Sequence, residues 1–209
     1  MIAGLGDDWD IVSPGGTIKL HACCGASHYC IDALLGLVAD HHVHADDVEV
    51  IECHVPPMVP GILKYSEPNT GLEGKFSMQY AMAAALLDGK AGIGQFTDEA
   101  VRRPDARAAA RKVRYVHPKG MVDSTAEIVA QPHRVVLRLT DGTVVERACR
   151  FFRGRAENPL SRDELIGKFR DCAAPVMPAA QSDRVIELVD RLDSIDRIAE
   201  LDMTLLTQG

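Results

Sequence analysis

The segment SMQYAMAAALLDG, from Ser77 to Gly89, constrains the fold more than any other part of this 209-residue chain. Its apolar side chains extend around the whole helix instead of along one stripe, so a helix formed here has to be buried on all sides. Ser77 is a typical N-cap residue and Gly89 is typical of the position after a helix end, which predicts a helix over 77–88. The rest of the chain must therefore supply the layers that cover this helix.

Segments with strand character occur on both sides of the apolar helix. Alternation of apolar and polar residues predicts strands over 17–22, 47–55, 112–118, 126–131 and 133–151. Asp141-Gly142 divides the last segment into a hairpin. We predict an α+β fold with a mostly antiparallel sheet of about five strands, packed helices and a helical C-terminal extension.

The chain is predicted to have two parts, an α+β domain over 1–160 and a helical extension over 161–209. Ser161 and Glu164 form a capping-box pattern that opens a helix at the start of the second part. Two amphipathic helices are predicted after it, over 181–192 and 195–207. We expect this extension to pack on the first domain or on a partner.

Composition excludes several classes of protein. No apolar run approaches the about 18 residues that a membrane helix needs, and the acidic start MIAGLGDDWD does not fit a signal peptide. The net charge of -7 gives no general basis for nucleic-acid binding. The six cysteines lack the spacing of a disulfide framework. We therefore expect reduced thiols in a cytoplasmic protein with no membrane or nucleic-acid partner.

The stretch TIKLHACCGASHYC places Lys19, Cys24 and His28 around a predicted helix N-terminus near Ser27. The free N–H groups and the positive dipole end of a helix, together with a lysine, suit a carboxylate or a phosphate. A thiol in that position would have a lowered pKa. The structural alternative is that the cysteines are small buried residues and that His28 caps the helix. The spacing of the cysteines and this histidine fits no standard zinc motif, so we expect no metal.

A second stretch, EGKFSMQY, repeats this arrangement, since Lys75 and Ser77 precede the buried helix and Tyr80 lies one turn into it. If the two stretches converge, they would bind a di- or tricarboxylate, with Tyr80 as a proton donor or hydrogen-bond partner. The structural alternative is that Lys75 faces solvent and Tyr80 belongs to the core. We expect Lys19, His28 and Tyr80 to share one concave surface and to be the catalytic residues. We expect the substrate to be bound by Lys19, Cys24, Lys75 and Ser77.

Three segments of the chain resemble one known family in the same order. They are IKLHACCGASHYCIDA, EPNTGLEGKFSMQYAMAAALLDG and GRAENPLSRDELIGKF. These resemble motifs of the MmgE/PrpD family, whose members include 2-methylcitrate dehydratase, cis-aconitate decarboxylase and an iminodisuccinate epimerase. The first two motifs are long and specific, and the three together span nearly the whole chain.

The resemblance implies a two-domain enzyme with a large helical domain, a smaller α+β lid domain and an active site between them, without a cofactor or metal. This chain resembles only the lid part. By the same resemblance, Lys19 faces the substrate carboxylates and Tyr80 faces the cleft, while Cys24 and His28 lie near the same pocket. Lys75 and Ser77 match the second motif, where they either contact substrate or shape the helix start.

One departure from the family pattern is that His21-Ala22 replaces Tyr-Pro after the lysine. The resemblance therefore does not identify the substrate. The resemblance implies a lyase that dehydrates, decarboxylates or epimerises a small polycarboxylate. The chain alone is expected to be inactive and to need a helical N-terminal-type domain, or to form a homo-oligomer. The alternative is a non-catalytic anion-binding or assembly module derived from this domain.

Overall fold

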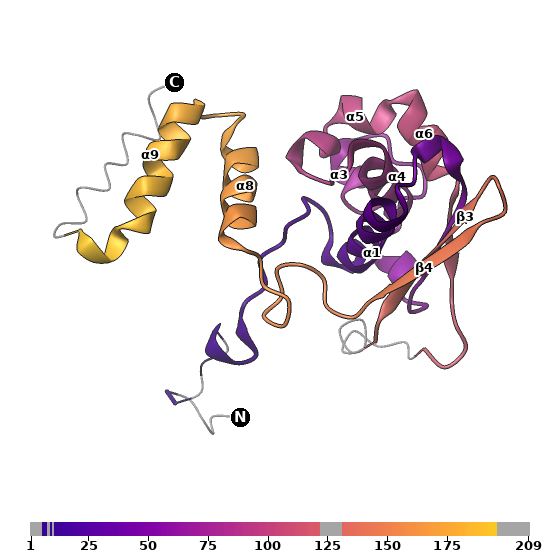
Figure 1. Ribbon diagram of the computed structural model, residues 1–209, viewed down its shortest axis with the longest axis horizontal. Helices are drawn as coiled ribbons and strands as arrows, with labels where there is room; N and C mark the ends of the chain where they lie inside the picture. Colours follow the sequence, from indigo (N-terminus) through magenta and orange to yellow (C-terminus); the bar gives the residue numbers. More distant parts are fainter. Residues whose placement is uncertain (1–5, 8, 10, 122–130, 196–209) are drawn as a thin grey trace. The chain divides into compact units, whose positions relative to one another are not determined.

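The structure is a computed structural model that describes residues 6, 7, 9, 11–121 and 131–195 (Figure 1). The chain divides into two compact units, Met1–Pro159 and Leu160–Gly209. Whether these units behave as separate domains stays a prediction. No helix in the described part of the chain is long and apolar enough to cross a membrane. None of the six cysteines, all of which are described, forms a disulfide.

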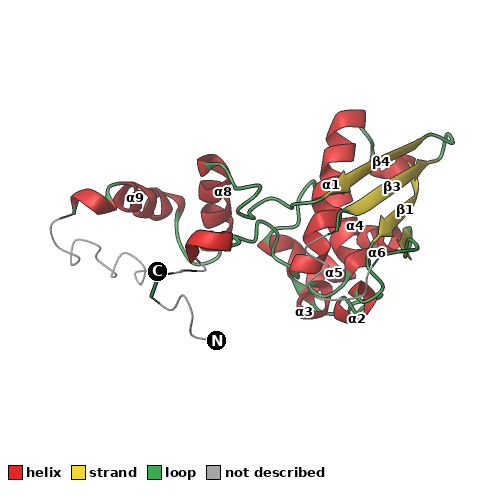
Figure 2. Ribbon diagram, turned by 90° about the horizontal axis from the view of Figure 1, so that it is seen from below, coloured by secondary structure: helices red, strands yellow, loops and turns green. Residues whose placement is uncertain are grey.

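The first unit is α+β, as predicted, with helices packed on a four-stranded sheet of order β2-β1-β3-β4 (Figure 2). Strand β1 pairs parallel with β2 and antiparallel with β3, and β3 pairs antiparallel with β4. The strands are β1 (Val48–His54), β2 (Val113–Val116), β3 (His133–Leu139) and β4 (Val144–Cys149). The helices are α1 (Gly25–His41), α2 (Val59–Ile62), α3 (Gly71–Gly74), α4 (Met78–Asp88), α5 (Asp98–Arg102) and α6 (Pro104–Ala110), with a π-helical turn at Ile11–Gly15 and 3-10 turns at Ala45–Asp47 and Ile93–Phe96.

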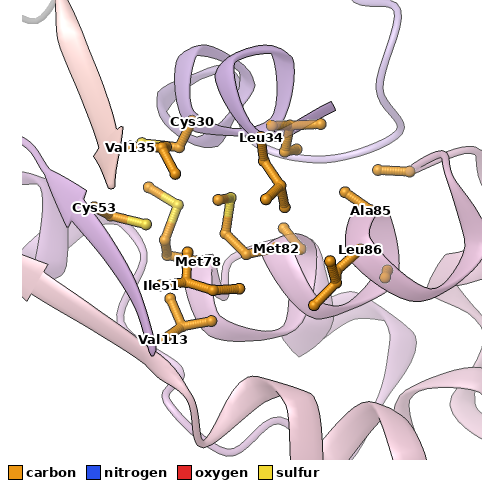
Figure 3. Close-up of a cluster of buried hydrophobic side chains, with 14 of the residues drawn as sticks. Cys30, Leu34, Ile51, Cys53, Met78, Met82, Ala85, Leu86, Val113 and Val135 are labelled. Atoms are coloured by element: carbon orange, nitrogen blue, oxygen red, sulfur yellow. The ribbon is translucent and has the colours of Figure 1, made fainter. Parts of the chain in front are cut away.

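Helix α4 is buried at the centre of the first unit, as its apolar composition predicted. It packs against α1, α6 and β2. Its side chains Met82 and Leu86 meet Leu34 of α1 and Ile51 of β1 in one apolar cluster (Figure 3). The predicted caps are also confirmed, because the Ser77 hydroxyl accepts a hydrogen bond from the Tyr80 N–H and the residue after the helix adopts a left-handed conformation.

The sheet has one apolar face and one polar face. On β3, Val135 and Leu137 are buried in the core, whereas the alternate residues Arg134 and Arg138 form ion pairs on the other face. Arg138 pairs with Glu52 across the sheet at 2.9 Å. The side chains of β3 thus alternate between the two faces, although Val136, between the two arginines, is also buried.

The predicted hairpin at Asp141-Gly142 is confirmed. The Asp141 carboxylate accepts a hydrogen bond from the Thr143 N–H at 2.8 Å. Gly142 has a φ of 88°, a conformation that side-chain-bearing residues rarely adopt. The turn therefore sets the register of β3 and β4 locally.

The strand predicted over 17–22 is wrong. The Ile18 N–H donates a hydrogen bond to the Gly154 carbonyl, and the Ala22 N–H donates one to the Ala91 carbonyl. This segment is therefore hydrogen-bonded to two loops and does not pair with the edge of the sheet. The buried side chain of the segment is His21, while Ile18 is exposed, so the alternation did not mark a core face. The strand predicted over 126–131 lies outside the described residues except for Gln131.

The second unit contains α8 (Arg162–Ala173), α9 (Ala179–Asp190) and a 3-10 turn, Leu192–Ser194. The capping box is confirmed, since the Ser161 N–H donates to the Glu164 carboxylate at 2.8 Å and the Glu164 N–H donates to the Ser161 hydroxyl. The helix predicted over 181–192 corresponds to α9. The helix predicted over 195–207 lies outside the described residues except for Ile195.

Candidate functional site

The candidate site is built where α1 begins. Cys24 is the N-cap of α1, and its side chain makes no capping hydrogen bond. Its backbone N–H instead donates to the Lys75 carbonyl oxygen at 2.9 Å. This hydrogen bond joins the two motifs that the sequence analysis identified separately, and it holds the segment before α4 against the start of α1.

Lys19 lies over the first turn of α1. A Cβ atom built on Gly25 would be 3.9 Å from the Lys19 Cε, so the lysine side chain passes close to the helix N-terminus. Both Lys19 and Lys75 are exposed. Among the described residues, neither lysine forms an ion pair with a carboxylate. The Lys19 ammonium group, free of any carboxylate partner, therefore lies close to the positive end of a helix dipole, which favours an anion. Lys75 is joined to the same helix start through its backbone carbonyl.

Cys23 is buried beside this site, with its Sγ 3.1 Å from the Ser27 hydroxyl oxygen. Burial raises the pKa of the Cys23 thiol to about 12, so the thiol is neutral at physiological pH. The expectation of a lowered thiol pKa is therefore wrong for Cys23, because burial outweighs the hydrogen bond with Ser27 and the charge of Lys19. Cys24 is partly exposed.

His28 is completely buried and does not cap the helix. Its Nε2 lies 3.4 Å from the Cys23 carbonyl oxygen, to which it can donate, and its Nδ1 is buried without a partner among the described residues. The ring packs edge-on against His21 and Phe152. Burial, followed by the His21 ring, lowers the pKa of His28 to about 4. His28 is thus a neutral imidazole that supports the segment before α1.

Tyr80 is also buried, and its hydroxyl donates to the Gln95 carbonyl oxygen. Burial raises the pKa of Tyr80 to about 12. Its ring lines a pocket of about 320 Å³, but none of Lys19, His28 or Lys75 lines that pocket. That Lys19, His28 and Tyr80 share one concave surface therefore stays a prediction. Their catalytic roles also stay predictions. Ser77 is buried as the α4 N-cap.

Asp32, which no sequence motif indicated, ties three segments together at this site. One carboxylate oxygen accepts from His21 Nε2 at 2.7 Å, and the other accepts from the Arg153 N–H at 2.6 Å. Asp32 lies one helical turn after His28 on α1, among buried apolar residues. A lone carboxylate on an otherwise apolar helix face was the signal that could have identified it. Within the described residues, no group of histidine, cysteine and acidic side chains could hold a metal ion.

Comparison with known proteins gives a consistent result. The family described as the MmgE/PrpD C-terminal domain matches residues 21–194. A cis-aconitate decarboxylase of Aspergillus terreus is 26% identical over 216 residues, covering 96% of this chain and 41% of that protein. The mouse cis-aconitate decarboxylase is 28% identical over 152 residues, covering 73% of this chain and 30% of that protein. The chain thus spans about two fifths or less of the length of these relatives.

Proposed function

The chain belongs to the MmgE/PrpD family, as its C-terminal domain, and from that premise we propose that it supplies one wall of a site for a small di- or tricarboxylate. The observation that carries the proposal is the position of Lys19 over the first turn of α1, with Lys75 held against the same turn by its backbone. A carboxylate placed there would meet the Lys19 ammonium group and the N–H groups of the helix start, with the exposed Lys75 side chain on the adjacent segment.

The reaction we propose is of the lyase type. Loss of carbon dioxide or water next to a carboxylate, or epimerisation there, develops negative charge that cationic groups stabilise. The relatives reported above are cis-aconitate decarboxylases, which favours decarboxylation over dehydration and epimerisation. Lys19 would hold a substrate carboxylate during this step, with Cys24, Lys75 and Ser77 forming the adjacent wall.

The proposed site lacks a side chain that is well placed to transfer a proton to or from the substrate. With a pKa of about 12, Tyr80 is a poor base at neutral pH, although its neutral hydroxyl can donate a proton once it leaves the Gln95 carbonyl. His28 is buried and neutral, so a direct catalytic contact would need a rearrangement of the segment before α1. We propose that the missing groups come from a helical domain of the family and that the chain alone is inactive.

The alternative function is a non-catalytic anion-binding or assembly module. The specific observation that favours it is that both expected acid–base side chains, His28 and Tyr80, are buried in the described structure. In that case Lys19 and the start of α1 would still bind an anion, and no turnover would follow when a helical domain is added.

Anion binding can be measured directly. We expect citrate, used as a stable tricarboxylate, to shift the backbone amide signals of residues 24–27 and 75–78 in a saturable way that weakens with added salt. Lys19→Gln should weaken the binding at least about tenfold, because it removes a charge-assisted contact. The matched control, Lys119→Gln, removes an exposed lysine elsewhere and should leave the titration unchanged. Equal binding by both variants would contradict the proposed site.

The apolar face between α8 and α9 is the proposed contact for a helical domain, or for a second copy of the chain when that domain is absent. This surface forms an open groove of about 290 Å³. An apolar face of this kind commonly marks an interaction surface. Its apolar lining residues are Leu165, Ile166, Phe169, Val185, Ile186 and Val189.

We expect the isolated chain to self-associate through this groove as its concentration rises. Light scattering should give a rising mean mass, and Phe169→Glu should return the chain to a monomer because a charge would be buried in the contact. Glu187→Lys, which changes an exposed residue of α9 that does not line the groove, serves as the control. A strict monomer at high concentration would contradict the proposed contact.

A further inference from the structure

The pocket lined by Tyr80 lies in the first unit, and none of Lys19, Cys24 and Lys75 lines it. It has a volume of about 320 Å³ and is bounded by the loop 66–69, the start of α4, helix α6 and the start of β2. Helices α4 and α6 pack against each other here (Figure 1). A volume of this size lies at the lower end of the range for ligand sites, which indicates a small molecule.

One wall of this pocket is apolar. Val101, Ala110 and Val113 are buried in the core and line it, together with the ring of Tyr80. Such a wall would accept a hydrocarbon group of a ligand. It would disfavour a tricarboxylate, since a charged group placed against it loses hydration without gaining a partner.

The pocket also has an unsatisfied hydrogen-bond acceptor. Gln79, the second residue of α4, lines the pocket, and its Oε1 is buried without a hydrogen-bond partner among the described residues. A buried acceptor left unpaired destabilises the protein. An N–H or O–H group of a ligand would satisfy this oxygen if the Gln79 side chain turned its amide toward the pocket on binding.

Two guanidinium groups complete the lining. Arg107 donates to the Asn69 side-chain oxygen at 3.1 Å, which leaves its other N–H groups available. Arg111 has no side-chain hydrogen bond or ion pair within the described residues. Glu67 also lines the pocket, but it forms no ion pair with either arginine in that part of the chain. The lining therefore has a net positive charge and free donors that suit one carboxylate.

We propose that this pocket binds a small monocarboxylate that carries a hydrogen-bond donor beside the carboxylate and a short apolar body. The carboxylate pairs with Arg107 and Arg111, the donor satisfies Gln79 Oε1, and the apolar body lies against Val101 and Val113. A branched 2-hydroxy acid has this chemistry. The lining of this pocket differs from that of the proposed polycarboxylate site, because it contains none of Lys19, Cys24 and Lys75. Tyr80 is the one residue named at both sites.

The test uses the full 209-residue chain and three matched probes, followed by backbone amide shifts. We expect 2-hydroxy-4-methylpentanoate to bind with shifts at residues 79–80 and 107–113. 4-Methylpentanoate, which lacks the donor, should bind about tenfold more weakly, and 4-methylpentane-1,2-diol, which lacks the carboxylate, should not saturate. Equal binding of all three probes, or shifts confined to residues 19–27, would overturn the proposal.

Two variants separate a ligand site from a structural role. Arg111→Gln should weaken binding of the hydroxy acid at least about tenfold, while Arg114→Gln, on the adjacent strand but outside the pocket lining, should not. Gln79→Met removes the unpaired acceptor, so it should raise the Tm of the free chain and still weaken binding. A Gln79→Met chain with a lower Tm and unchanged binding would overturn the proposal.

Discussion

Replacing Lys19 by alanine should lower kcat/KM on a small polycarboxylate by about 10²- to 10³-fold when the chain is supplied with a helical domain of the family. The reason is that Lys19 lies over the first turn of α1 and has no carboxylate partner among the described residues. Its charge is therefore free to stabilise the negative charge that develops in the substrate. Steady-state assays on cis-aconitate and 2-methylcitrate would measure the effect.

The controls for this experiment separate charge from packing. Lys19→Arg keeps the charge and should retain more activity than Lys19→Ala, although a planar guanidinium does not reproduce the position of an ammonium group. Lys119→Ala changes an exposed lysine outside the site and should have no effect. If Lys19→Ala left kcat/KM unchanged in an active assembly, Lys19 would have no part in the reaction.

Lowering the pH from 7 to 5 should cost the chain about 2 kcal/mol of unfolding free energy through His28 alone. Burial lowers the pKa of His28 to about 4 in the folded chain, whereas an exposed histidine has a pKa of about 6.5. Between these values the unfolded chain binds more protons than the folded chain. Stability contributed by the neutral imidazole is therefore complete above the unfolded pKa and is lost as the pH falls toward 4.

Urea unfolding at both pH values would measure this loss. His28→Gln keeps a donor for the Cys23 carbonyl but does not titrate, so its stability should change by about 2 kcal/mol less than that of the parent chain between pH 7 and pH 5. His44→Gln, at an exposed position before β1, is the matched control and should follow the parent chain. Equal pH dependence of the His28→Gln and parent chains would show that the imidazole is not held neutral in the folded state.

The parts of the fold that could be predicted from sequence are those whose signals are local. The buried position of α4 followed from its composition, and its ends followed from Ser77 and Gly89. The hairpin followed from Asp141-Gly142, where a left-handed turn is needed. In each case a few adjacent residues are sufficient, because caps and tight turns satisfy backbone groups within the same segment.

The segment before α1 was predicted incorrectly because its structure depends on distant partners. Its hydrogen bonds go to Ala91 and Gly154, and its buried His21 pairs with Asp32. An alternating pattern of six residues does not distinguish a strand from a segment held by such contacts. The candidate site shows the same limit. The motifs identified Lys19 and Lys75, but the burial of His28 and Tyr80 is a property of packing.

The most direct test of the central claim, that this chain is one wall of a two-domain polycarboxylate site, compares turnover by the purified chain with turnover after a helical family domain is added in trans. We predict no substantial reaction with cis-aconitate or 2-methylcitrate by the chain alone. A single wall leaves the bound substrate exposed to water and lacks the groups that would align the substrate with an acid–base residue. The helical domain should restore activity that Lys19→Ala then removes. Robust turnover by the chain alone, abolished by Lys19→Ala, would contradict the claim and show that the site is complete in this chain.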